Sequence, residues 1–94
     1  MANPTLHVRI LSPQSIILEA DAQSVSSKNS QGSFDVLPQH ANFITVIENS
    51  PITVRTAGQK PQTFKFPIAI MHVQSDKVDI YTYVQPETLP ETKK

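Results

Sequence analysis

The chain has 94 residues, eight basic and eight acidic side chains, a formal net charge of zero and no cysteine. This length holds one domain with one hydrophobic core, and the absence of cysteine excludes a disulfide framework and a thiolate metal site. The basic residues are scattered along the chain, which disfavours nucleic-acid binding and charge-driven attachment to a lipid surface. The longest apolar run, residues 68–71, is far shorter than the roughly 18 residues that a spanning helix needs.

Alternation of apolar and polar residues begins close to the start of the chain. Residues 6–10 follow the period of a half-buried strand. Residues 15–20 fit either a helical turn or a strand, and their pair of isoleucines favours the strand. We expect residues 22–27 to continue that strand after a bend near Asp21.

Turn signals then recur at intervals of about eight to twelve residues, which is typical of a β-sandwich or barrel. Residues 68–73 form the most apolar of the expected strands and are predicted to lie centrally. Further strands are expected at residues 34–37, 43–47, 52–55, 63–66 and 78–81. The predicted fold is all-β, an antiparallel β-sandwich of about ten short strands over residues 1–84, followed by a flexible polar tail over residues 85–94.

Residue types found in catalytic and metal sites are present, but their spacing is unsuitable. Ser33, Asp35 and His40 lie too close along one strand and turn to form a catalytic triad, so a small hydrolase ranks last among the functions considered. His7 and His72 stand on separate strands, without the spacing of metal ligands. The sequence therefore predicts no catalytic residue, no metal and no cofactor, and favours a binding or structural subunit.

Two tyrosines near the end of the last strand offer an alternative. Tyr81 and Tyr83 share one strand face and could stack on a sugar, as in a stand-alone β-sandwich module that binds carbohydrate or a protein ligand. An edge of the core or a subunit contact is the favoured interpretation of the same pair.

The run Gly-Ser-Phe-Asp-Val-Leu-Pro-Gln-His-Ala over residues 32–41 carries a resemblance to a known family. It resembles the Gly-Glu-Phe-Gly-Val-Leu-Pro-Gly-His-Ala-Pro segment of the epsilon subunit of F-type ATP synthases, called delta in mitochondria. The Leu-His-Val-Arg-Ile-Leu-Ser-Pro segment and residues 17–25 agree in order, and the resemblance covers roughly residues 5–84. Asp35, Gln39 and Asn42 stand where the family has Gly, Gly and Pro. Asp35 can keep a glycine-like backbone, whereas Gln39 fits less easily.

The resemblance implies a non-catalytic β-sandwich in the rotating central stalk. There it would hold the gamma subunit to the c-ring and help couple ion translocation to ATP synthesis or hydrolysis. The implied location is peripheral, on the cytoplasmic face of a bacterial plasma membrane in preference to an organellar inner membrane or thylakoid. The implied membrane contact runs through the partner subunits alone, without lipid insertion and without nucleic acid.

The resemblance also implies which residues make these contacts. Ser33 stands where the family often has an acidic residue that touches the ring, and His40 stands at the family's histidine. Residues 85–94 cannot form the family's C-terminal helical hairpin, so no inhibitory role is expected. The predicted contact loop comprises Gln31, Gly32, Ser33, Asp35, Leu37, Pro38, His40 and Asn42.

Overall fold

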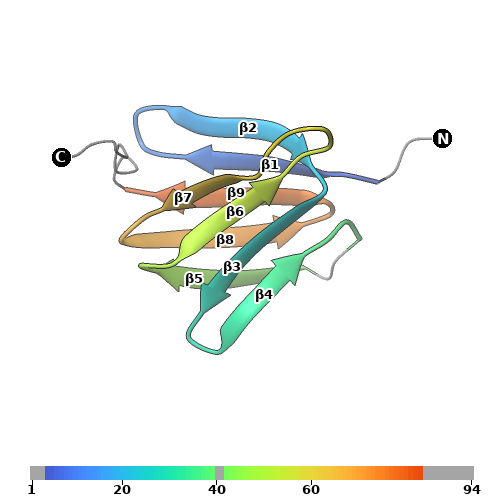
Figure 1. The fold of residues 1–94 in the computed structure, drawn as a ribbon. Helices are drawn as coiled ribbons and strands as arrows, with labels where there is room; N and C mark the ends of the chain where they lie inside the picture. The colour runs from blue at the N-terminus through green and yellow to red at the C-terminus, as the bar shows by residue number, and fades with distance from the viewer. Residues whose placement is uncertain (1–3, 40–41, 84–94) are drawn as a thin grey trace.

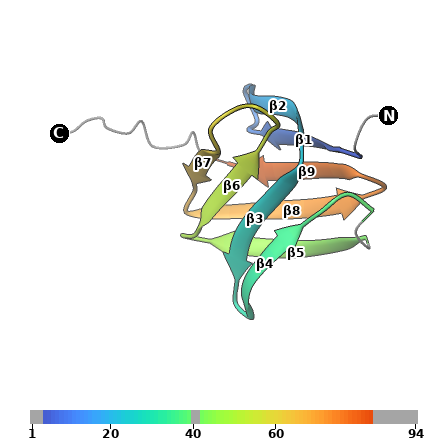
Figure 2. The ribbon, with the colours of Figure 1, turned by 45° about the vertical axis from the view of Figure 1, so that its right-hand side comes forward.

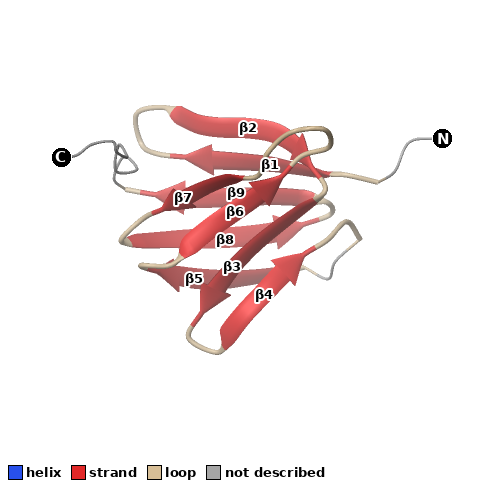
Figure 3. Cartoon of the chain, viewed as in Figure 1, coloured by secondary structure: helices blue, strands red, loops and turns tan. Residues whose placement is uncertain are grey.

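Two β-sheets face one another in the computed structural model, which describes residues 4–39 and 42–83 (Figure 1). The five-stranded sheet has the order β2 (Ile16–Ala22), β1 (Leu6–Leu11), β9 (Lys77–Thr82), β8 (Ile68–Gln74), β5 (Phe43–Glu48). The four-stranded sheet has the order β4 (Gly32–Val36), β3 (Ser24–Asn29), β6 (Pro51–Arg55), β7 (Gln62–Lys65). No helix occurs in these residues (Figure 3).

The predicted all-β sandwich is confirmed, with nine strands in the described residues where about ten were expected. The strand predicted at residues 68–73 is β8, which lies inside its sheet between β9 and β5. His40 and the tail predicted at residues 85–94 lie outside the described residues.

One strand pair differs from the antiparallel arrangement that the sequence predicts. β1 and β9 run parallel, with Val8 opposite Val78 and Ile10 opposite Ile80. The other strand pairs in the described part of the chain are antiparallel. The first and last strands of the described residues therefore lie side by side within the larger sheet (Figure 1).

The core lies between the sheets and is built from the inward half of each alternating strand. Leu6, Val8 and Ile10 of β1 are fully buried, as the alternation of residues 6–10 predicts. Each fully buried side chain of this size stabilises the fold by about 1.5–3 kcal/mol. The same core includes Ala22, Val25, Val36, Ile47, Ile52, Val54, Phe66, Ala69, Met71, Val73, Val78 and Ile80.

The chain passes from one sheet to the other at Gln23, between β2 and β3 (Figure 2). The Gln23 amide donates a hydrogen bond to the Arg55 carbonyl at 2.7 Å, which ties the crossing point to β6. The expectation that residues 22–27 continue the preceding strand is wrong, because β3 pairs with β4 and β6 in the other sheet. At the far end of β3, Asn29 Nδ2 donates to Thr45 Oγ1 of β5 at 2.9 Å.

Candidate functional site

The residues predicted to form one contact loop are separated by strand β4. Gln31 and Gly32 lie at the β3–β4 turn, whereas Leu37 and Pro38 follow the other end of β4. Five strand residues span about 16 Å. The structure therefore places the predicted contact residues at two ends of the sandwich, with Ser33 and the other strand residues between them.

The β3–β4 turn is shaped by one asparagine and one glycine. Asn29 Oδ1 accepts the Gln31 amide at 2.9 Å. Gly32 has a φ of 125°, a conformation that residues with a side chain rarely adopt. A glycine is therefore needed at this position for its backbone, independently of any contact with a partner.

Ser33 and Asp35 are exposed on β4. Asp35 accepts a hydrogen bond from Ser26 Oγ at 2.5 Å, and Ser26 Oγ accepts one from Arg55 Nη1 at 2.7 Å. The hydrogen bond of the Asp35 carboxylate thus runs across the sheet to β3, which does not fit a triad with Ser33. Asp35 has the extended backbone of a strand, so the glycine-like backbone considered for it is not used.

The segment after β4 lies against the β8–β9 turn. The Gln39 amide donates to Asp76 Oδ1 at 2.6 Å, and the Ser75 amide donates to Asn42 Oδ1 at 3.2 Å. Gln39 has a φ of 68°, so it adopts the left-handed conformation that a glycine would adopt without strain. Leu37 is 53% exposed at the same end.

Sequence reasoning missed an apolar surface on the outer face of the five-stranded sheet. Strand register aligns Val46 with Ile70, Ile70 with Tyr81, Tyr81 with Leu11 and Leu11 with Ile16, so one row crosses all five strands. Leu11 is half-buried and the other four are exposed, with Tyr81 at 44%. We call these five residues the apolar row. Antiparallel sheets that face water on one side carry polar side chains there, so this row is unusual.

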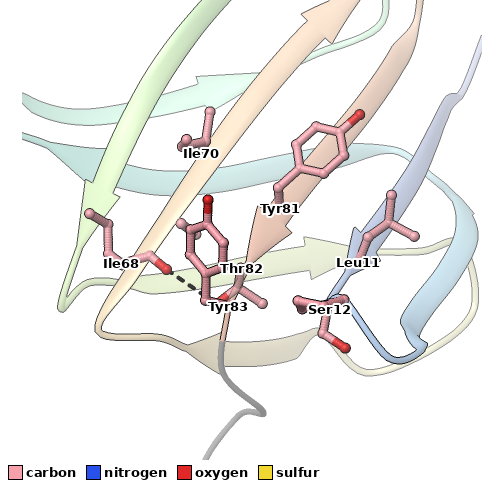
Figure 4. Close-up of a pocket in the computed structure, with 9 residues that line it drawn as sticks. Leu11, Ser12, Ile68, Ile70, Tyr81, Thr82 and Tyr83 are labelled. Carbon is pink, nitrogen blue, oxygen red and sulfur yellow. Dashed lines mark hydrogen bonds between the residues drawn. The ribbon is translucent and has the colours of Figure 1, made fainter.

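A groove with a volume of about 410 Å³ lies along part of the apolar row, and Leu11, Ile70 and Tyr81 are among the residues that line it. Figure 4 shows Leu11, Ile68, Ile70, Tyr81 and Tyr83 projecting from neighbouring strands around it. Tyr81 and Tyr83 both line the groove, which agrees with the prediction that they share a face. The lining is mostly aliphatic and aromatic, which suits apolar side chains better than a hydrophilic ligand.

A row of charged and polar side chains runs beside the apolar row on the same face. Arg9 Nε and Nη2 donate to the two carboxylate oxygens of Asp79 at 2.9 and 3.1 Å. His7 contacts Asp21 Oδ1 through Nδ1 at 3.0 Å and Glu19 Oε2 through Nε2 at 2.7 Å. The hydrogen bond with Asp21, followed by that with Glu19, raises the pKa of His7 above its usual value.

The sequence did contain a signal for the apolar surface. Residues 68–71 are apolar at every position, which the alternation of a strand with one buried face does not explain. In the structure, Ala69 and Met71 point into the core while Ile68 and Ile70 are exposed. A strand that is apolar on both faces indicates a second covering layer, and the four-stranded sheet covers the inner face alone.

Within residues 4–39 and 42–83, no three or more His, Asp or Glu side chains are grouped so that they could hold a metal ion. No helix with the length and apolar character needed to cross a membrane is found in the same ranges.

Comparison with known proteins gives a family match over most of the chain. The family model described as ATP synthase, Delta/Epsilon chain, beta-sandwich domain matches residues 5–84. The ATP synthase epsilon chain of Ureaplasma parvum is 33% identical over 86 residues, covering 87% of this chain and 60% of the relative. That of Brevibacillus brevis is 26% identical over 73 residues, covering 78% of this chain and 55% of the relative. The chain thus spans a little over half the length of these curated relatives.

Solved structures show the same fold. A chain in the Euglena gracilis mitochondrial ATP synthase, a structure comprising OSCP, F1 and the c-ring, matches with a TM-score of 0.79 and 19% identity. The match covers 90% of this chain and 56% of the Euglena chain. At this identity the likeness establishes the β-sandwich architecture.

Proposed function

The chain belongs to the ATP synthase delta/epsilon-chain β-sandwich family, and from this membership we propose that it is a non-catalytic subunit of the central stalk of an F-type ATP synthase. In this role it links the gamma subunit to the c-ring and couples ion translocation to ATP synthesis or hydrolysis. It is peripheral to the membrane and is held there by its partner subunits, without lipid insertion. The proposed location is the cytoplasmic face of a bacterial plasma membrane.

The apolar row is the observation that carries this proposal. Val46, Ile70 and Tyr81 lie in register on adjacent strands and are each more than two-fifths exposed. Contiguous exposed apolar surface on a small domain is typical of a protein interface. We assign this face to the gamma subunit. The segment after β4, with Leu37, Pro38 and Asn42, is the part of the predicted contact loop that we assign to the c-ring.

The mixture of apolar and charged rows supports a protein partner over a sugar. A carbohydrate needs several polar groups to bind its hydroxyls, whereas the surface of the groove that Tyr81 and Tyr83 line is mostly apolar. Tyrosines that lie beside aliphatic side chains often contribute strongly to binding in protein interfaces. The carbohydrate-binding module that the tyrosines suggest is therefore the weaker candidate.

The proposal is tested by reconstitution of the chain with purified gamma subunit and c-ring. We expect co-purification of the wild type, and binding to gamma weakened at least about tenfold by Ile70→Ser or Tyr81→Ser. Thr53→Ser, on the outer face of the four-stranded sheet, is the matched control and should bind as the wild type does. A wild-type chain that binds neither gamma nor the ring would refute the proposal.

The same variants distinguish the proposed stalk subunit from the alternative, a carbohydrate-binding module. If a glycan array gives a ligand whose affinity falls in Tyr81→Ser while gamma does not bind, the carbohydrate-binding module is correct. Binding of gamma without any glycan signal supports the stalk subunit.

A further inference from the structure

Gln39 adopts a backbone conformation that its side chain disfavours. Its φ of 68° lies in the left-handed region, which glycine enters freely and other residues enter at a cost. A compensating contact is therefore expected nearby. The structure shows one, a hydrogen bond of 2.6 Å from the Gln39 amide to Asp76 Oδ1. A carboxylate acceptor makes this bond stronger than one between neutral groups.

Asp76 is itself held in place by the β8–β9 turn that contains it and by a hydrogen bond from β1. It is the second residue of the two-residue turn between β8 and β9, where Ser75 and Asp76 have φ values of 50° and 63°. Positive φ at both positions is the pattern of the tight hairpin turn whose twist matches that of the strands. The Asp76 carbonyl accepts the His7 amide at 2.8 Å, which fixes the turn against β1.

A second hydrogen bond joins the same turn to the start of β5. The Ser75 amide donates to Asn42 Oδ1 at 3.2 Å. Gln39 and Asn42 are therefore hydrogen-bonded to one turn that comes from a segment more than 30 residues further along the chain.

We propose that Asp76 is a positioning residue for the predicted c-ring contact after β4. Its carboxylate holds Gln39 in the left-handed conformation and so sets the direction in which the chain leaves Leu37 and Pro38. This inference rests on the proposed function, because the ring contact belongs to that proposal. Asp76 acts through Gln39 and does not need to touch the ring.

Glycine substitutions at the two turn positions distinguish the effect of losing the Asp76 carboxylate from the effect of changing the turn backbone. Asp76→Gly removes the acceptor but keeps a favourable residue at a positive-φ position, so the hairpin is retained. Ser75→Gly also places a favourable residue at a positive-φ position of the same turn. It leaves the Asp76 carboxylate and the backbone amide of residue 75 in place. The two variants therefore differ in the carboxylate and not in the quality of the hairpin.

Amide hydrogen exchange in the free 94-residue chain measures the contact without any partner. We expect the Gln39 amide to exchange about tenfold faster in Asp76→Gly than in the wild type, and to keep its wild-type rate in Ser75→Gly. Equal exchange rates in the wild type and Asp76→Gly would overturn the proposal.

Binding to a purified c-ring with gamma tests the positioning role. We expect Asp76→Gly to bind about tenfold more weakly, and Asp76→Gly with Gln39→Gly to recover most of the loss, because glycine adopts a φ of 68° unaided. Asn49 also has positive φ but lies in the β5–β6 turn, so Asn49→Gly should leave ring binding unchanged in the wild type and should not restore it in Asp76→Gly.

Two outcomes contradict the role. Wild-type binding by Asp76→Gly, with fast Gln39 exchange, would show that the contact exists but does not position the ring-binding residues. A wild-type chain that fails to bind the ring would overturn the proposed function and the positioning role together, while the exchange rates would still report the Gln39–Asp76 contact.

Discussion

The Arg9 guanidinium and the Asp79 carboxylate form a two-pronged ion pair across the parallel strands β1 and β9, with nitrogen–oxygen distances of 2.9 and 3.1 Å. The two residues are 70 positions apart in sequence. The hydrogen bond to Asp79 raises the pKa of Arg9. The pair lies beside the apolar row and joins β1 to β9.

Replacing Arg9 with lysine tests the geometry of this pair. Lysine keeps the positive charge but cannot donate two parallel hydrogen bonds to one carboxylate. Because the pair is partly exposed, we expect a melting temperature lower by about 2–5 °C, measured by circular dichroism. Lys65→Arg on the edge strand β7 is the matched control. Identical melting of Arg9→Lys and the wild type would show that charge alone stabilises the pair.

The His7 cluster predicts a pH dependence of stability. The folded pKa of His7 is raised by Asp21 and Glu19, whereas in the unfolded chain it is about 6.5. The stabilisation by this cluster is therefore complete below about pH 6.5 and is lost as the pH rises through the folded pKa. Urea unfolding of the wild type and His7→Gln should differ more at pH 6 than at pH 8.5. A difference that grows with pH would contradict the assigned contacts.

Gly32 and Gly58 are expected to respond differently to substitution. A Cβ at either position meets no atom within 4 Å, so the cost of a substitution comes from the backbone alone. Gly32→Ala, at a φ of 125°, should lower the free energy of unfolding by about 1–2 kcal/mol. Gly58→Asn, at a φ of 73°, should cost less, because asparagine tolerates that region. Urea unfolding measures both, and equal costs would show that the turn at Gly32 can adjust.

Ile70 and Met71 are neighbours in β8 that face opposite sides of the sheet. Met71 is fully buried, so Met71→Ala should cost about 2–5 kcal/mol of unfolding free energy. Ile70 is exposed, so Ile70→Thr should change stability by no more than about 0.5 kcal/mol. Chemical unfolding checks both values. A large loss in Ile70→Thr would mean that Ile70 supports the fold and is not available to a partner.

Strand positions and buried faces could be predicted because they depend on local alternation. Leu6, Val8 and Ile10 follow the period of two and are all buried. Strand partners could not be predicted in the same way, since periodicity says which face a residue occupies but not which strand lies beside it. The parallel pairing of β1 with β9 and the change of sheet at Gln23 are both of this kind.

The predicted contact residues stay a prediction, and the structure shows how they are placed relative to one another. Asn42 contacts the β8–β9 turn, as does Gln39, which follows Leu37 and Pro38, whereas Gln31 lies at the opposite end of β4. The hydrogen bond between Gln39 and Asp76 could not be foreseen, because it spans 37 positions of the sequence. The apolar run at residues 68–71 signals an apolar surface, but the row could not be predicted because it depends on which strands lie beside one another.

The position of β9 has a consequence for how the protein folds during synthesis. β9 is the last strand to be made among the described residues, yet it occupies the middle of the five-stranded sheet between β1 and β8. Without β9, no described strand joins the β1–β2 pair to the β8–β5 pair, so we expect the core between the sheets to stay open until residue 82 has left the ribosome. Folding that waits for such a distant pairing is slow, on the order of milliseconds to seconds, and exposes apolar surface meanwhile. Truncation inside β9 should therefore leave a chain that aggregates rather than a smaller sandwich.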